Sequence, residues 1–334
     1  MDISEASAND GGEGNGRARP GEGQTVKKGM AKIVSIRRKR FGFHFREALD
    51  AYLFIMPWIL GFIAFTAGPM LASLYFSFTK YEVLTPPKWR GLYNYGRMIH
   101  DPLLWKSLYN TAYYVFFGVP GRLIVALTFA IILNQKIWSM PIYRALFYLP
   151  SVVPVVASAI LWLWVFNPDY GLANSVLDFF GLPLQKWLWD VNLAKPCFVL
   201  LAMWHFGSQM VIFLAGLQSI PKPLYEAATI DGANRWQLFK SVTIPLLTPM
   251  IFFNLIMAII TSFQVFTTAF IATGGGPRNA TLFYLLYLYR NAFEWFRMGY
   301  ASAMAWILFL IILALTLIDF LLAKRWVYYE AETL

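Results

Sequence analysis

The stretch LYEAATIDGANRWQLFKSVTIPLL, from Leu224 to Leu247, is a short charged island between two long apolar runs. It mixes acidic and basic side chains with small alanines and large aromatic rings, and Gly232 stands near its middle. Islands of this kind interrupt a chain that is otherwise strongly apolar. The nature of the flanking runs therefore decides the fold.

The composition indicates an integral membrane protein. The chain has 334 residues, of which 58% are hydrophobic and only 14% are charged. A soluble domain carries about 25% charged residues. A chain this apolar cannot hide its hydrophobic surface in one aqueous core.

The charge distribution favours a membrane surface over a nucleic acid as the partner of the amino-terminal segment. The net charge is +10, and ten of the 28 Lys and Arg residues lie in the first 50 positions. Residues 1–46 combine a polar, glycine-rich start with a basic stretch, which predicts a disordered cytoplasmic tail beside anionic lipid. The single cysteine, Cys197, permits no internal disulfide and is too little for a structural zinc site, so a buried apolar role is expected.

The apolar runs predict an all-α membrane domain over residues 47–330 with six spans, each long enough to cross about 30 Å of hydrocarbon. The first run is too long for a signal peptide. Pro150, Pro154 and Pro249 lie near the starts of their spans, where a missing N–H is tolerated. The predicted spans are 50–79, 107–134, 144–167, 196–218, 246–272 and 300–323.

The basic tail sets the expected orientation, because Lys and Arg before a first span keep that end in the cytoplasm. Six spans then return the carboxyl terminus to the cytoplasm. The other segments outside the spans show no such bias, since ten Lys and Arg fall in the predicted external loops and seven in the predicted cytoplasmic segments. The charged island lies on the cytoplasmic side in this threading.

The island itself predicts two short helices around a glycine. Pro223 suits the first turn of a helix over Leu224–Asp231. Gly232 can take the left-handed conformation that ends it. Asn234 is a good N-cap for a second helix, Arg235–Thr243, after which Pro245 marks the entry into the fifth span.

The residue types of the island suit a protein–protein contact. Small alanines let a partner approach the backbone, large rings act as anchors, and Glu226 and Asp231 offer charge to a basic partner. An amphipathic helix lying on the bilayer is the alternative, and it requires a basic polar face. Here the acids are mixed with Lys222, Arg235 and Lys240, so that alternative fits less well.

The spacing Glu226-Ala227-Ala228, three residues, then Gly232 resembles the EAA loop of ATP-binding-cassette importers, which here covers residues 219–245. The run Gln218–Pro221, the element Thr273–Pro277 and the segment Arg290–Met304 are also similar to the carbohydrate permeases of that superfamily. The resemblance covers residues 50–330 and implies the type I importer permease fold, with a cytoplasmic coupling helix.

The resemblance also implies partners and a location. We expect a second homologous permease subunit, two ATPase subunits, an extracytoplasmic solute-binding protein and the lipid of a bacterial or archaeal cytoplasmic membrane. ATP and Mg would be bound by the ATPases, because this chain has no GxxxxGK[ST] sequence and no expected cofactor or metal of its own. The residues expected to dock on the ATPase are Tyr225, Glu226, Ala227, Ala228, Asp231, Gly232 and Ala233.

Polar side chains in the fourth and fifth spans are candidates for the solute path, because uncharged hydrogen-bonding groups beside aromatic rings suit a sugar. Hydrogen bonding between helices is the alternative for each of them, and His205 is open to proton transfer or to packing. Arg122, inside the second span, could pair with a partner subunit or with an anionic solute. The candidates are His205, Ser208, Gln209, Asn254, Thr261, Ser262, Gln264 and Thr267.

The sequence also bears on other functional classes. No constellation of residues looks catalytic. An ion-coupled secondary transporter would need charged residues in broken helices and an internal repeat, and it would leave the island unexplained. A permease for a non-sugar solute, and a sensor or assembly factor on the same fold, are further alternatives.

Overall fold

The computed structural model describes residues 47–135 and 138–328, so the predicted tail 1–46 lies outside the described residues. Contacts divide the chain into two units, residues 1–70 and 71–334. A helix begins at Glu47 in the first unit and is interrupted there by a π-helical turn, η1 (Ile63–Ala67); α2 (Gly68–Ser77) follows and contains the boundary between the units. Pro69 follows that turn; a proline ring clashes with the carbonyl four residues earlier, and a widened turn relieves the clash.

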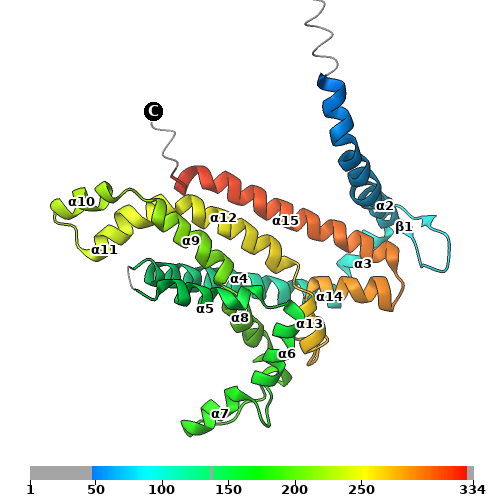
Figure 1. The fold of residues 1–334 in the computed structure, drawn as a ribbon. Coiled ribbons are helices and arrows are strands. Elements are labelled where there is room, and N and C mark those ends of the chain that lie inside the picture. The colour runs from blue at the N-terminus through cyan, green and yellow to red at the C-terminus, as the bar shows by residue number, and fades with distance from the viewer. Residues whose placement is uncertain (1–46, 136–137, 329–334) are drawn as a thin grey trace, which may run out of the picture. The chain divides into compact units, whose positions relative to one another are not determined.

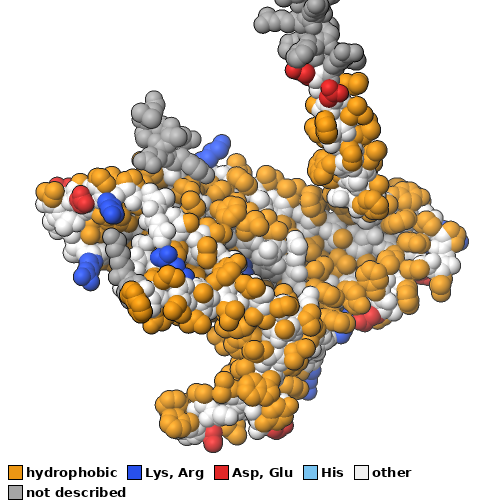
Figure 2. Space-filling view, in the orientation of Figure 1, with side chains coloured by type: hydrophobic (Ala, Val, Ile, Leu, Met, Phe, Trp, Pro, Cys, Tyr) orange, Lys and Arg blue, Asp and Glu red, His pale blue; other side chains and the backbone are white. Residues whose placement is uncertain are grey.

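Long apolar helices of the second unit confirm two predicted spans and part of a third. They are α4 (Pro102–Leu133), a continuous helix over Arg235–Phe263, and α15 (Met298–Trp326). The helix Glu47–Ser77 likewise confirms the predicted span at 50–79. Figure 1 shows α12 and α15 side by side, and the space-filling view in Figure 2 shows hydrophobic side chains covering both.

The third span is broken, in contrast to the single helix predicted over 144–167. It consists of α5 (Met140–Val152) and α6 (Val155–Val165), which meet at 96°. Pro154 accounts for the break, because proline disfavours helical geometry at the residue before it and Val153 is extended, with ψ of 129°. The prediction that the helix tolerates Pro154 was therefore wrong.

The fourth span, predicted as one helix over 196–218, is also broken. It consists of α8 (Ala194–Trp204) and α9 (Gly207–Ser219), bent by 43°. No proline lies at this break. Instead His205 Nδ1 lies 3.3 Å from the Leu201 carbonyl, the acceptor that the backbone N–H of His205 would take in a continuous helix. A side chain inserted into the helical ladder in this way bends the helix.

The fifth span differs from its prediction at both ends. α11 (Arg235–Leu238), the π-helical turn η3 (Phe239–Thr243) and α12 (Ile244–Phe263) form one helix, so Pro245 does not separate them. The π turn again precedes a proline and accommodates it. The helix then ends at Phe263, and the predicted remainder of the span becomes the separate short helix α13 (Thr267–Ala272).

The two broken spans cross at Gly207, where the backbones lie in close contact. A Cβ added at Gly207 would lie 3.0 Å from both the Phe147 carbonyl oxygen and the Tyr148 Cα of α5. The Ser151 hydroxyl accepts the freed N–H of Ser208 at 3.2 Å. Glycine is therefore required here by the close approach of two main chains.

Asp101 links several elements at the end of the bundle where α4 begins. Its Oδ1 caps α4 by accepting from the N–H groups of Leu103 and Leu104, and its Oδ2 accepts from the hydroxyls of Tyr287 (2.7 Å) and Tyr300 (2.6 Å). Burial alone would raise the pKa of this carboxyl, but the four hydrogen bonds together lower it below its usual value. Burial and the bond to Asp101 raise the pKa of Tyr287 to about 12.

Short elements complete the described chain at the Asp101 end of the spans. A small antiparallel hairpin pairs Thr79 with Trp89 and Lys80 with Lys88. The glycine-rich loop after α13 is fixed to α4, because the Asn110 side chain donates to the carbonyls of Asn279 and Leu282. The remaining elements are β1 (Thr79–Lys80), β2 (Lys88–Trp89), α3 (Tyr93–Ile99), α7 (Leu172–Phe179), η2 (Trp187–Trp189), α14 (Tyr284–Tyr289) and η4 (Arg290–Glu294).

We predict that Gly207→Ala lowers the stability of the folded chain by about 1–3 kcal/mol, because the added methyl meets backbone atoms that cannot move independently. Gly96→Ala is the matched control, since nothing lies within 4 Å of a Cβ there. Alanine also favours helix over glycine, so the control is expected to be neutral or mildly stabilising. Thermal unfolding in detergent measures both; equal midpoints would contradict a tight crossing at Gly207.

Candidate functional site

The island folds as two helices joined by a left-handed glycine, as predicted. α10 (Lys222–Ile230) starts with Pro223 in its first turn, and Gly232 has φ of +85°. The Gly232 N–H donates to the Thr229 carbonyl and the Ala233 N–H to the Ala228 carbonyl, each at 3.0 Å. This pair of bonds is a Schellman motif, which satisfies the last carbonyls of α10 and fixes the direction of the turn.

The second helix of the island begins with a complete capping box. Asn234 Oδ1 accepts from the Gln237 N–H at 2.9 Å, and Gln237 Oε1 accepts from the Asn234 N–H at 2.7 Å. The predicted N-cap at Asn234 is confirmed, and Gln237 is its partner. Together the Schellman motif and the capping box make the turn between α10 and α11 a defined structure.

The island is largely exposed and has unpartnered charges on its surface. Glu226 and Asp231 are exposed, and neither forms a salt bridge within residues 47–135 and 138–328. Tyr225, Ala228 and Ala233 are half-buried, whereas Ala227 and Gly232 are exposed. Figure 2 shows Lys, Arg, Asp and Glu side chains gathered at the end of the molecule where α10 and α11 lie.

Large apolar side chains of the island are also exposed, and two of them stand out. Ile230 is 86% exposed and Trp236 is 68% exposed. Trp236 is one of the large rings of the island that were expected to act as anchors. The residue types did not indicate Ile230, because its exposure depends on how α10 packs. Exposed apolar groups between unpaired acids are the composition of a surface that another protein covers.

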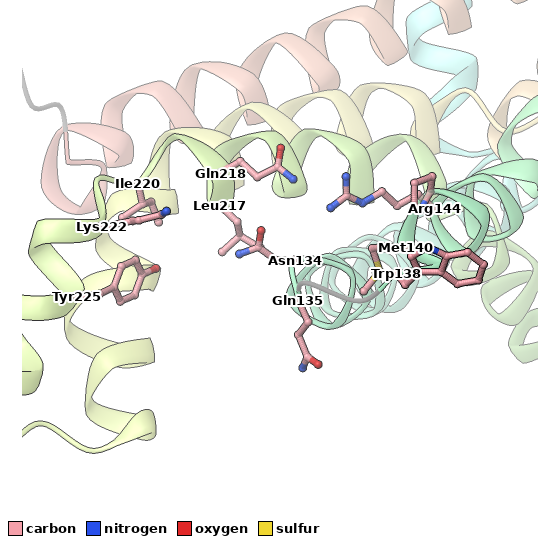
Figure 3. Close-up of a pocket in the computed structure, with 11 residues that line it drawn as sticks. Asn134, Gln135, Trp138, Met140, Arg144, Leu217, Gln218, Ile220, Lys222 and Tyr225 are labelled. Atoms are coloured by element: carbon pink, nitrogen blue, oxygen red, sulfur yellow. The ribbon is translucent and has the colours of Figure 1, made fainter.

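The island is tied to the long helix beside it. The Tyr225 hydroxyl lies 3.0 Å from the Thr243 hydroxyl, which links α10 to η3. A cavity of about 810 Å³ lies between α10, the ends of α4 and α9, and the start of α5. Figure 3 shows Lys222 and Arg144 directed toward each other across it. Arg144 also donates to the Leu133 carbonyl at the end of α4, where a cation is favourable.

The polar side chains predicted for the solute path lie at two levels along the spans. The middle tier contains His205, Ser208, Gln209 and Asn254, and the outer tier contains Thr261, Ser262, Gln264 and Thr267. Taking about 1.5 Å per residue, Gln209 lies about 15 Å from the end of α9 and Asn254 about 15 Å from the start of α12, both measured from the α10 end of the spans. α9 packs on α12, where a Cβ at Gly216 would meet the Met250 and Leu247 side chains. The structure thus brings Gln209 and Asn254 to about one level along the spans.

The middle tier has unpartnered polar atoms. Gln209 Oε1 and Asn254 Nδ2 are enclosed by protein and have no hydrogen-bond partner in the described chain. His205, one turn from Gln209, differs: a carbonyl only accepts, so Nδ1 donates to Leu201 and Nε2 accepts from Ser158 at 3.3 Å. Both ring nitrogens are used, as expected for a packing histidine. Ser208 is exposed, and its backbone N–H bonds Ser151.

The outer tier lies near the break between α12 and α13. Thr261 is exposed, and its hydroxyl returns to the carbonyls of Met257 and Ala258 in its own helix. Ser262 is buried, Gln264 is exposed at the C-cap of α12, and Thr267 begins α13 half-buried. These four residues are about 10 Å or more farther along the span than Asn254, so the candidates do not form one cluster.

The sequence matches the family described as "Binding-protein-dependent transport system inner membrane component" over residues 122–328. It is 49% identical to the "Probable ABC transporter permease protein YesP" of Bacillus subtilis over 91% of this chain and 97% of that protein. It is 34% identical to the "Trehalose/maltose transport system permease protein MalF" of Thermococcus litoralis over 82% of this chain and 93% of that protein. The chain belongs to this family of inner-membrane permease components.

Solved structures agree in fold. A chain of a bacterial alginate ABC transporter, in complex with its pentasaccharide-bound periplasmic protein, superposes with a TM-score of 0.75. The match covers 84% of this chain and 96% of that chain at 21% identity. The all-α fold of this chain is therefore that of an importer permease.

We predict that Asn234→Ala speeds hydrogen exchange at the amides of Arg235–Leu238, because the capping bond to Gln237 contributes about 1 kcal/mol to this end of the helix. Asn234→Asp is the matched control, since aspartate accepts the same bond. Exchange followed by mass spectrometry reports both variants. Unchanged rates in Asn234→Ala would mean that the cap does not hold the turn.

Proposed function

We propose that this chain is the membrane-spanning permease subunit of an ATP-driven importer and that the α10–Gly232–α11 island is its docking site for an ATPase. The exposed, rigid island is the observation that carries this proposal. Its unpaired acids suit a basic groove, and Ile230 and Trp236 supply the apolar contacts of an interface. In this arrangement α10 is the coupling helix.

The assembly would contain a second homologous permease, two ATPase subunits and a solute-binding protein outside the membrane. ATP and Mg would be bound by the ATPases, and the termini of this chain would face the cytoplasm of a bacterium or archaeon. The exposed apolar side chains of the spans support a partner permease as well as lipid contacts. The spans would lie in the cytoplasmic membrane.

The solute is a sugar or oligosaccharide in this proposal. Relatives named for trehalose and maltose and for arabinooligosaccharides are 34% and 31% identical to this chain. The middle tier supports the same class, because Gln209 and Asn254 present an acceptor and a donor that hydroxyl groups can satisfy.

The continuous helix Arg235–Phe263 supplies a mechanism for coupling. The residues that would contact the ATPase, around Trp236, and the middle-tier residue Asn254 belong to one rigid element. The Tyr225–Thr243 contact links α10 to this helix. A displacement of the island on ATP binding would therefore reach the solute tier directly, as alternating access requires.

Reconstitution tests the function. We expect vesicles that contain this chain, its partner permease and the ATPase pair to accumulate a sugar when loaded binding protein and ATP are supplied on the correct sides. An ion gradient without ATP should give no uptake. Uptake by this chain alone, driven by a proton or sodium gradient, would instead establish the secondary-transporter alternative.

We predict that Gly232→Pro abolishes solute-stimulated ATP hydrolysis in the assembled complex, by at least about tenfold. Proline is fixed near a φ of about −65° and lacks the N–H that bonds Thr229, so α10 must point in another direction. Gly181→Pro is the matched control, because Gly181 also has a positive φ of +66° but lies beyond α7, at the other end of the spans.

Glu226→Lys should act at the same step, since a like charge at an interface costs several kcal/mol. Asp178→Lys, an exposed reversal of charge in α7, is its control. Both island variants should insert normally, because neither residue lies in a span. Wild-type stimulation in Gly232→Pro and Glu226→Lys would refute the docking role of the island.

A further inference from the structure

Arg122 is a cation inside a membrane span that has no counter-charge. It lies in α4, about 18 Å from Asn134 at the α10 end of the helix. Its Nε and Nη2 atoms are enclosed by protein, and no hydrogen bond or ion pair to them is found within residues 47–135 and 138–328. A charge so placed costs several kcal/mol unless something pairs with it.

The guanidinium does not escape to the membrane surface. Long side chains near helix ends can extend to the headgroups, but that solution leaves the charged atoms exposed. Here α4 lies tightly against α8, since a Cβ at Gly121 would be 1.9 Å from the terminal carbon of Met203. The approach of Gly121 to Met203 places this turn of α4 beside the end of α8, next to the break of the fourth span.

The acidic side chains of the described spans do not neutralise this charge. Asp319 lies deeper in its span than the other acidic side chains, about 10 Å from the end of α15, and its Oδ2 also has no hydrogen-bond partner among the described residues. Tyr114, about two turns from Arg122 in α4, and His205, at the break beside that helix, bring no negative charge in their ordinary states. Within residues 47–135 and 138–328, no acidic side chain neutralises Arg122.

Arg122 shares its level with Gln209 and Asn254. All three lie about 15–18 Å from the α10 end, on helices α4, α9 and α12, which pack on one another. Their unpartnered atoms are the N–H donors of Arg122 and Asn254 and the single acceptor of Gln209. Donors outnumber acceptors at this level. A ligand that satisfies them would carry a group rich in acceptor oxygens beside a hydroxyl.

We propose that the transported solute is an acidic oligosaccharide whose carboxylate is bound by Arg122, with Gln209 and Asn254 bonding its neighbouring hydroxyls. The proposal rests on the importer function argued above. A planar guanidinium binds a carboxylate through two parallel hydrogen bonds. A phosphate would bring up to two negative charges, and Arg122 is the one fixed positive charge that the described residues place at this level.

The test uses the complete complex in vesicles, with its binding protein in excess. The probes are uronate-containing di- and trisaccharides, and the same sugars after reduction of each carboxyl to an alcohol. We expect the wild type to take up at least one uronate probe and Arg122→Gln to slow that uptake about tenfold or more, as loss of a charged hydrogen bond predicts. Uptake of the reduced sugar should change by less than about twofold, because it offers no charge to lose.

Two further variants sharpen the result. Arg122→Lys keeps the charge without the fork and should retain more uronate uptake than Arg122→Gln. Arg90→Gln makes the same chemical change at an exposed residue outside the spans and should alter neither rate. Comparing each variant with the wild type on both sugars cancels the preference of the binding protein itself.

The outcomes separate the two proposals. Equal losses for acidic and reduced sugars, or failure of Arg122→Gln to assemble with the second permease, would show that Arg122 is a structural or intersubunit group, and the proposal would be overturned. Uptake of neutral sugars but no uronate would overturn it while leaving the importer function intact. Uptake of no sugar of either kind would overturn the importer function itself.

Discussion

Every interruption of a helix within hydrocarbon releases backbone donors and acceptors that water cannot satisfy, and the described structure meets that constraint by crossing its two broken spans at one point. The Ser151 hydroxyl accepts the freed N–H of Ser208, and His205 takes the carbonyl of Leu201. The third span thus supplies one acceptor to the break of the fourth, and the fourth satisfies one of its own carbonyls with a side chain. Gly207 permits the approach, and the position of the middle polar tier follows from it.

Hydropathy and local chemistry predicted a large part of this fold. The span positions follow from hydrophobic length, and the turn of the island follows from Gly232 and Asn234, whose conformations are set by their own residues. The bend at His205 could not be predicted in this way. Its cause is a side chain competing for a backbone carbonyl, and the same residue in another rotamer would leave the helix straight.

Prolines were informative only in combination with what precedes them. Pro154 breaks its span because Val153 becomes extended, whereas Pro245 stays within a helix because a π turn over Phe239–Thr243 absorbs the clash. The sequence around the two prolines does not distinguish these outcomes. The second outcome matters for function, since it joins the proposed docking surface and Asn254 in one helix. The exposure of Ile230 likewise depends on packing, which a single sequence does not contain.

An uncompensated cation at the centre of an importer has a consequence for the transport cycle. While no solute is bound, the charge of Arg122 costs less free energy in a conformation that admits water to it than in one that seals it from both sides. A bound carboxylate removes that difference, because the charge is then paired inside the protein. On the proposed function, the bound solute would therefore stabilise the closed conformation more than the open one. A ligand shifts a conformational equilibrium only through such a difference in its interaction with the two states. The continuous helix from Arg235 to Phe263 would carry that preference back to the ATPase, so that one unpaired guanidinium could serve both selectivity and coupling.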